Sequence, residues 1–121
     1  MGPETRFKQL IRDHLAKNGW DVQAIETSTG RGVPDLSVAH PKVGDVWIEV
    51  KYGDRLGRER PEQVAWKTRG AMRGRRCITV WGWKESGWLF WLRVYTRTGQ
   101  TYTLATNNLH ETLFDNLWFF K

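Results

Sequence analysis

Residues 32–53 (GVPDLSVAHPKVGDVWIEVKYG) constrain the fold of this chain more than any other segment. Apolar residues at positions 36, 38, 46, 48 and 50 alternate with other residues, which is the pattern of half-buried strands. We therefore expect strands over residues 34–40 and 45–52, joined by a hairpin turn around residues 41–43. The turn can contain three or five residues, with Gly44 free to adopt a left-handed conformation.

Either turn length places two acidic side chains opposite each other. Both pair residues whose numbers sum to 84, so Asp35 faces Glu49 with Cβ atoms about 4.5–5.5 Å apart. Alternation puts Trp47, Glu49 and Lys51 on this same face of the sheet. Facing carboxylates repel each other, so the pair requires a compensating cation or a shared proton.

A metal ion is one such cation, because carboxylates and a main-chain carbonyl are the oxygen ligands that Mg²⁺ and Mn²⁺ prefer. Lys51 lies two residues beyond Glu49, where its ammonium group can contact a phosphate or a metal-bound water. It could also act as a base if it lost its proton. A metal-activated water, a phosphate and a balancing cation together predict a phosphodiester hydrolase.

The remaining periodicity predicts an α/β order around this hairpin. We expect helices over residues 3–18, 61–72 and 108–117, and further strands over residues 20–26, 75–83, 88–95 and 101–105. The order α-β-β-β-α-β followed by β-β-α indicates a mixed sheet flanked by helices. A length of 121 residues is typical of a single domain, here residues 1–121, with a core over 4–83 and an extension over 84–121.

The positive charge of the chain is concentrated in one segment. Residues 51–76 contain nine basic and three acidic residues, and this surplus equals the formal net charge of +6 for the whole chain. A nucleic acid is the expected partner, and a solvated helix face is the alternative. The residues expected to contact DNA are Arg31, Arg55, Arg58, Arg60, Lys67, Arg69, Arg73, Arg75 and Arg76.

Composition also bears on the expected location. No apolar run reaches the roughly 18–20 residues that a membrane helix needs, and no secretory signal is recognisable. The single cysteine, Cys77, has no partner for an internal disulfide. We therefore expect a cytoplasmic protein in a reducing environment.

Five positions resemble a known nuclease signature. The segments GVPD (32–35) and IEVK (48–51) resemble the PD-(D/E)xK nuclease signature, and Glu4 and Gln63 match the same superfamily. Over residues 4–83, the pattern E…G-x-P-D…E-V-K…Q-x-x-W is most similar to the virus-type replication-repair nuclease (VRR-NUC) domain. The resemblance implies a restriction-endonuclease-like core and a metal-dependent DNA endonuclease.

The resemblance also implies individual roles. Asp35, Glu49 and the backbone carbonyl of Val50 would bind Mg²⁺, for which Mn²⁺ could substitute. Glu4 would support a second metal or bind through a water, although it could simply favour the helix N-terminus. Lys51 would orient or activate the nucleophile. Gln63 would position the nucleophile, unless it is an ordinary first-turn residue.

Small stand-alone members of this kind are associated with homodimers that cut branched DNA such as four-way (Holliday) junctions. The alternatives are a flap or sequence-specific endonuclease, and a non-catalytic DNA-binding protein on the same scaffold. The aromatic residues after position 80 exceed what one small core is expected to bury, so we expect some of them at a subunit interface. Docking of the C-terminal helix onto its own sheet is the alternative.

Overall fold

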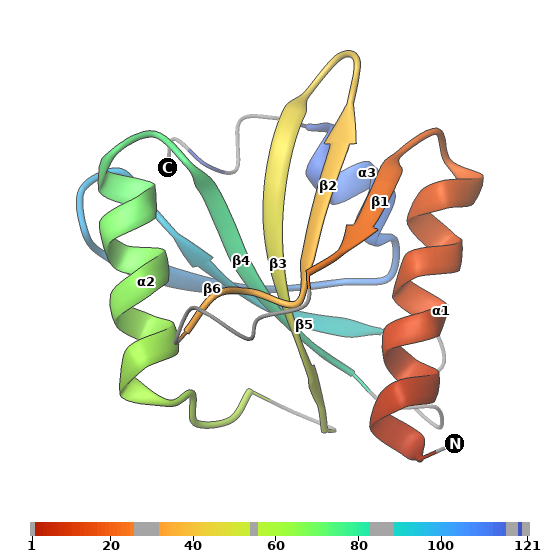
Figure 1. The fold of residues 1–121 in the computed structure, drawn as a ribbon, viewed down its shortest axis with the longest axis horizontal. Helices are drawn as coiled ribbons and strands as arrows, with labels where there is room; N and C mark the ends of the chain where they lie inside the picture. The colour runs from red at the N-terminus through yellow and green to blue at the C-terminus, as the bar shows by residue number, and fades with distance from the viewer. Residues whose placement is uncertain (1, 26–31, 54–55, 83–88, 116–118, 120–121) are drawn as a thin grey trace.

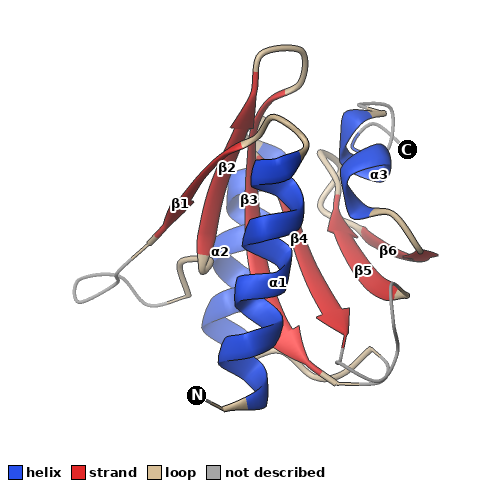
Figure 2. Cartoon of the chain, turned by 90° about the vertical axis from the view of Figure 1, so that its right-hand side faces the viewer, coloured by secondary structure: helices blue, strands red, loops and turns tan. Residues whose placement is uncertain are grey.

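The computed structural model describes residues 2–25, 32–53, 56–82, 89–115 and 119, which form one six-stranded sheet with helices on both faces (Figures 1 and 2). In chain order the elements are α1 (Pro3–Lys17), β1 (Asp21–Ala24), β2 (Leu36–His40), β3 (Gly44–Tyr52), α2 (Pro61–Met72), β4 (Arg76–Gly82), β5 (Phe90–Tyr95), β6 (Thr101–Thr106) and α3 (Leu109–Phe114).

The sheet follows the order of the chain, from β1 at one edge to β6 at the other. Strands β3 and β4 are parallel, and the other neighbouring pairs are antiparallel. A parallel pair needs a crossover connection, and α2 supplies it. In Figure 2, α1 lies in front of the sheet and α2 lies behind it.

Alternation along β3 separates the two faces of the sheet. Val46, Ile48 and Val50 are buried on the face that α1 covers with Phe7, Ile11 and Leu15. The opposite face carries polar residues between aromatic ones and is covered by α2. The centre of the Trp66 ring of α2 lies 5.3 Å from the centre of the Trp47 ring of β3. This polar face is where the acidic residues of the hairpin lie.

The structure confirms the predicted hairpin. Leu36 pairs with Ile48 and His40 with Gly44, so the residue numbers sum to 84 and the turn has three residues. Gly44 adopts the left-handed conformation, with φ at 93°. The first strand is shorter than the expected residues 20–26, and the last helix is shorter than residues 108–117.

Several of the aromatic residues after position 80 are buried within this chain. Trp81, Phe90 and Phe119 belong to the protein's own buried residues, and Leu109 and Leu113 of α3 are buried as well, which agrees with the alternative of docking this helix onto its own sheet. Phe114 is 40% exposed. Trp83, Trp88, Leu117, Trp118 and Phe120 lie outside the described residues. None of the helices within the described ranges is long and apolar enough to cross a membrane.

Candidate active site

Asp35 and Glu49 come together at the start of the β2–β3 hairpin. Asp35 directly precedes the pair formed by Leu36 and Ile48, so its next partner across the strands is Glu49. The Asp35 Oδ2 atom accepts a hydrogen bond from the backbone N–H of Val50 at 2.9 Å. The Asp35 Oδ1 atom accepts one from Lys8 Nζ of α1 at 3.3 Å. Asp35 is therefore oriented by both β3 and α1.

The two carboxyl groups differ in charge state. Burial, followed by the hydrogen bond to Asp35 and its negative charge, raises the pKa of Glu49 to about 8. Burial also opposes ionisation of Asp35, but hydrogen bonds from Glu49, Val50 N–H and Lys8 together hold the pKa of Asp35 below its ordinary value. In the metal-free protein, a proton on Glu49 therefore relieves the repulsion.

A second feature of Glu49 fits a role as a metal ligand. Its side chain is only 4% exposed, and its Oε1 atom has no hydrogen-bond partner among the described residues. Buried polar atoms are normally satisfied, and the exceptions concentrate at functional sites. An unpartnered carboxylate oxygen beside a second carboxylate fits a hard divalent cation. Within the part of the chain that the structure describes, no third His, Cys, Asp or Glu completes a larger metal-binding group.

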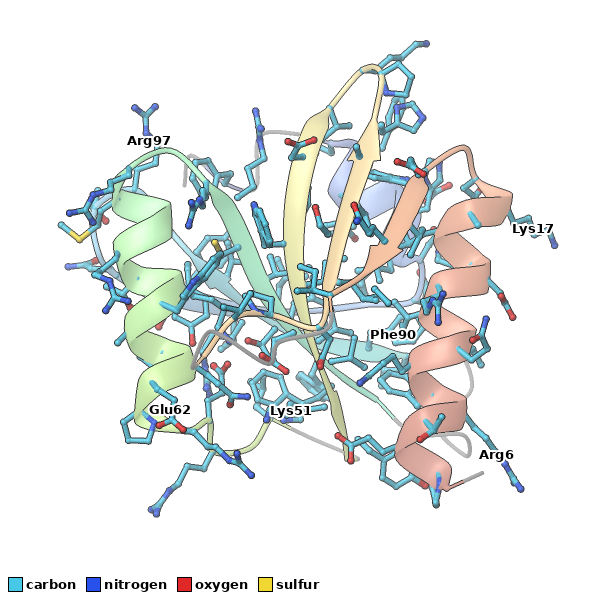
Figure 3. All side chains as sticks on the ribbon, viewed as in Figure 1. Arg6, Lys17, Lys51, Glu62, Phe90 and Arg97 are labelled. Carbon is cyan, nitrogen blue, oxygen red and sulfur yellow. The ribbon has the colours of Figure 1, made fainter. Side chains whose placement is uncertain are left out.

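Lys51 and Gln63 lie at the same end of the molecule as the acid pair. Lys51 is half-buried near the end of β3, and its positive charge acts to lower the pKa of Glu49. Figure 3 shows it in the lower half of the molecule, where α1 and α2 both begin. Gln63 accepts a hydrogen bond from the backbone N–H of Arg60 at 3.2 Å, so it caps the first turn of α2. Its proposed catalytic role stays a prediction.

Glu4 occupies the first turn of α1 and is exposed. It lies one turn before Lys8, so both residues project from the same side of the helix. Sequence reasoning assigned Glu4 but missed Lys8, whose position four residues after Glu4 was the available signal. Whether Glu4 acts on a metal stays a prediction.

The structure explains why the G-x-P-D segment has a glycine at position 32. Gly32 has φ at 82°, and a Cβ atom on it would lie 2.1 Å from the backbone oxygen of Glu62. The loop before Asp35 therefore packs directly against the first turn of α2. This contact joins the start of α2 to the loop that leads into Asp35.

A buried ion-pair network lies beside the site. The Glu59 carboxylate accepts hydrogen bonds from Lys67 Nζ at 2.5 Å, Thr79 Oγ1 at 2.5 Å, Arg93 Nη1 at 3.1 Å and the Tyr95 hydroxyl. Burial opposes ionisation, but the charge of Lys67 and these hydrogen bonds hold the pKa of Glu59 below its ordinary value. Thr79 pairs with Glu49 across β3 and β4, so the network adjoins the acid pair.

This network corrects one sequence-based expectation. Lys67 was expected to contact DNA, but it is 0% exposed and paired with Glu59. A buried ammonium group whose charge is balanced by Glu59 cannot reach a phosphate, so the prediction that Lys67 contacts DNA is wrong. Its charge acts inside the protein instead, where it also acts to lower the pKa of Glu49.

Most of the other expected DNA-binding residues are available at the surface. Those that are exposed are Arg58, Arg60, Arg69, Arg73 and Arg75. Arg76 is half-buried, with its guanidinium group 5.9 Å from the centre of the Phe119 ring. Arg31 and Arg55 lie outside the described residues.

The fold is a mixed six-stranded α/β sheet flanked by helices, with the αβββαβ core and the hairpin–helix extension that the sequence predicts. Among solved structures, the chain is similar to that of Archaeoglobus fulgidus Hjc, a Holliday junction resolvase from an archaeal hyperthermophile. The TM-score is 0.62 at 14% sequence identity, over 90% of this chain and 98% of that chain. A likeness at this identity shows the fold alone. No protein-family model and no curated protein sequence matches the chain.

Proposed function

We propose that this chain is a metal-dependent DNA endonuclease that hydrolyses phosphodiester bonds in branched DNA, as a four-way-junction resolvase does. The observation that carries this proposal is the pair of half-buried Asp35 and buried Glu49, with its unpartnered Glu49 oxygen, on a fold shared with a junction resolvase. Within this fold, the pattern of Glu4, Asp35, Glu49, Lys51 and Gln63 favours the small stand-alone VRR-NUC group.

Each site residue has a chemical role in this proposal. Asp35, Glu49 and the carbonyl of Val50 would hold Mg²⁺ or Mn²⁺, with Glu4 binding directly or through a water. The cation would supply Lewis acidity and an activated water. Lys51 would neutralise a phosphate oxygen and orient the attacking water, and Gln63 would help position it. Lys8 and the Val50 N–H fix the orientation of the Asp35 carboxylate.

The proposal includes a homodimer. One active site in each chain makes one nick, and resolution of a junction needs two nicks placed symmetrically, which a twofold dimer supplies. Exposed apolar side chains support an interface, because Met72 is 57% exposed and Phe114 is 40% exposed. Sedimentation as a monomer at micromolar concentration, with and without DNA, would remove the dimer from this account.

The proposed function is tested with a panel of labelled DNAs in Mg²⁺, Mn²⁺ or EDTA. The panel contains a four-way junction, a flap and a linear duplex built from the same strands. We expect paired nicks near the branch point of the junction, with either metal and not with EDTA. Discrete fragments from the linear duplex would instead identify a sequence-specific enzyme. Binding without cleavage in either metal would identify a non-catalytic DNA-binding protein.

A further inference from the structure

A pocket is lined by the C-terminal half of α2, and Figure 1 shows this half of the helix at the upper left. Its volume is about 440 Å³, and its lining consists of Trp66, Arg69, Gly70, Arg73 and Arg75. No carboxylate is among these lining residues, so its charge is wholly positive. A ligand that enters this pocket is therefore expected to be an anion.

One wall of the pocket consists of an indole ring with a guanidinium group beside it. The Arg75 guanidinium group lies 4.8 Å from the centre of the Trp66 ring and 5.6 Å from that of Trp47. The centres of the two indole rings are 5.3 Å apart. Aromatic rings and guanidinium planes are the surfaces on which unpaired bases stack. The pocket thus combines a stacking wall with two exposed arginines, Arg69 and Arg73, whose guanidinium groups are suited to a phosphate.

The pocket is too small to enclose a paired helix. A volume of about 440 Å³ falls within the range of small-molecule sites, roughly 300–1,000 Å³, and is far too small for duplex DNA. A single nucleotide carries both a base with a flat face and a phosphate. It is therefore the unit of DNA that matches this lining.

The pocket is connected to the strand that carries Glu49 through Trp47, whose ring packs on the lining residue Trp66. Trp47 lies two residues before Glu49 on the same face of β3, about 6.6 Å along the strand. A DNA strand that runs from Asp35 and Glu49 toward the C-terminal half of α2 would reach this wall.

We propose that this pocket takes up one unpaired nucleotide of the DNA strand that is cut, with its base on Trp66 and Arg75 and its phosphate on Arg69 and Arg73. The inference rests on the proposed nuclease function and specifies its substrate: DNA with an unpaired nucleotide beside the cleaved bond. An intact duplex lacks such a nucleotide, so the pocket would select gapped DNA, or a branch point at which a base pair has opened.

The test measures binding in EDTA by fluorescence anisotropy, so that no DNA is cut. Two labelled duplexes are compared, one fully paired and one with a two-nucleotide single-stranded gap. We expect the wild-type protein to bind the gapped DNA more tightly. Trp66→Ala should weaken gapped-DNA binding about tenfold and leave paired-DNA binding nearly unchanged. Trp66→Phe should keep most of the preference.

Two double variants provide a matched comparison that does not depend on the packing of Trp66. Arg69→Ala with Arg73→Ala removes two exposed charges from the pocket. Arg58→Ala with Arg60→Ala removes two exposed charges outside it. The Arg69 and Arg73 variant should weaken binding of gapped DNA more than binding of paired DNA. The Arg58 and Arg60 variant should weaken binding of both DNAs equally. The proposal would be overturned if the two double variants weakened binding of gapped and paired DNA to the same extent. It would also be overturned if Trp66→Ala kept the wild-type preference for gapped DNA.

Two further measurements separate the alternatives. Free dTMP should not displace the gapped DNA at concentrations where an unlabelled gapped DNA does. Equal competition would make a free nucleotide the ligand and overturn the proposal. Cleavage in Mg²⁺ is measured separately on the same preparations. Loss of the binding preference with retained cleavage refutes the pocket alone, while a retained preference without cleavage refutes the nuclease.

Discussion

Glu49 illustrates how one residue can be unfavourable for folding and still be informative. A buried carboxyl oxygen without a donor costs roughly 1–3 kcal/mol of folding free energy, so such groups are rare in stable cores. Its pKa of about 8 shows that the environment keeps the group protonated near neutral pH when no cation is present. Strongly perturbed acids concentrate at functional sites, and the proposed metal supplies the reason here.

Both carboxyl oxygens of Asp35 have hydrogen-bond donors, whereas the Oε1 atom of Glu49 has none among the described residues. Asp35 accepts hydrogen bonds from the Val50 N–H and Lys8, so its removal would leave these donors unpaired as well as removing a metal ligand. An Asp35 variant would therefore mix a folding defect with a catalytic one. Glu49→Gln keeps the shape of the side chain and is the cleaner probe.

Lys51→Ala should lower the cleavage rate about 10²–10⁴-fold while leaving metal affinity nearly unchanged. The reason is that a protonated lysine cannot be a metal ligand but can stabilise the phosphate and the water. Single-turnover cleavage and a calorimetric Mn²⁺ titration would measure the two effects. Lys17→Ala, at the far end of α1 in Figure 3, is the control. Loss of Mn²⁺ binding in Lys51→Ala would show that the assignment of roles is wrong.

At the scale of elements, the site depends on how α2 contacts the loop before β2. Gly32→Ala should destabilise the protein by more than about 3 kcal/mol and impair cleavage, because the new methyl group would meet the Glu62 backbone oxygen at 2.1 Å. Gly74→Ala is the matched control. Gly74 also has positive φ, at 99°, but no atom lies within 4 Å of its Cβ position. It should cost only about 1–2 kcal/mol, the effect of the backbone conformation alone.

Urea unfolding would give both free energies. Equal losses in the two variants would mean that positive φ, and not the contact with α2, determines the need for Gly32.

The Glu59 network joins the segment before α2 to strands β4 and β5, and it makes stability depend on pH. The pKa of Glu59 is lower in the folded protein than its ordinary value of 4.5, so the unfolded chain binds this proton more readily. The resulting stability is present above about pH 4.5 and is lost as the pH falls through the folded pKa. Wild-type protein should therefore lose unfolding free energy between about pH 5 and pH 3.

Glu59→Gln should lower the unfolding free energy at neutral pH by about 3 kcal/mol, because it leaves Lys67 buried without its counter-charge. It should also lose less stability than the wild type as the pH falls from about 5 to 3. Adding Lys67→Met should restore part of the loss by removing the uncompensated charge. Parallel pH curves for wild type and Glu59→Gln, from urea unfolding, would contradict this account.

At the scale of the whole molecule, the exposed arginines should determine DNA affinity. Contacts with about four phosphates would give a slope of log K against log salt near −3 to −4 for duplex arms, because each contact releases counterions. The double variant Arg58→Glu with Arg60→Glu should flatten this slope and weaken binding to all DNA sequences similarly. Arg12→Glu on α1 is the control. An unchanged slope in the double variant would place the DNA path elsewhere.

The fold could be predicted because local signals agreed along the chain. Alternation set the strands, Pro61 marked the start of α2, and the short turn fixed the register that brings Asp35 to Glu49. These features depend on neighbours in the sequence, so no long-range information was needed.

The buried network depended on contacts that the sequence does not display. Glu59 and Tyr95 are 36 residues apart, and Lys67 resembles the other basic residues of its segment. One signal was present: Lys67, Gly70 and Ala71 are spaced as the buried face of a helix. A lysine on that face should have been expected to need an acidic partner.

The central claim is that Asp35 and Glu49 form a metal-dependent nuclease site, and one comparison tests it most directly. Cleavage of a labelled four-way junction would be followed for wild type and Glu49→Gln at saturating Mg²⁺, with protein concentrations that bind the junction equally. We predict that Glu49→Gln binds the junction within about twofold of wild type but cleaves it at least about a hundredfold more slowly. Cleavage by Glu49→Gln at the wild-type rate would contradict the claim.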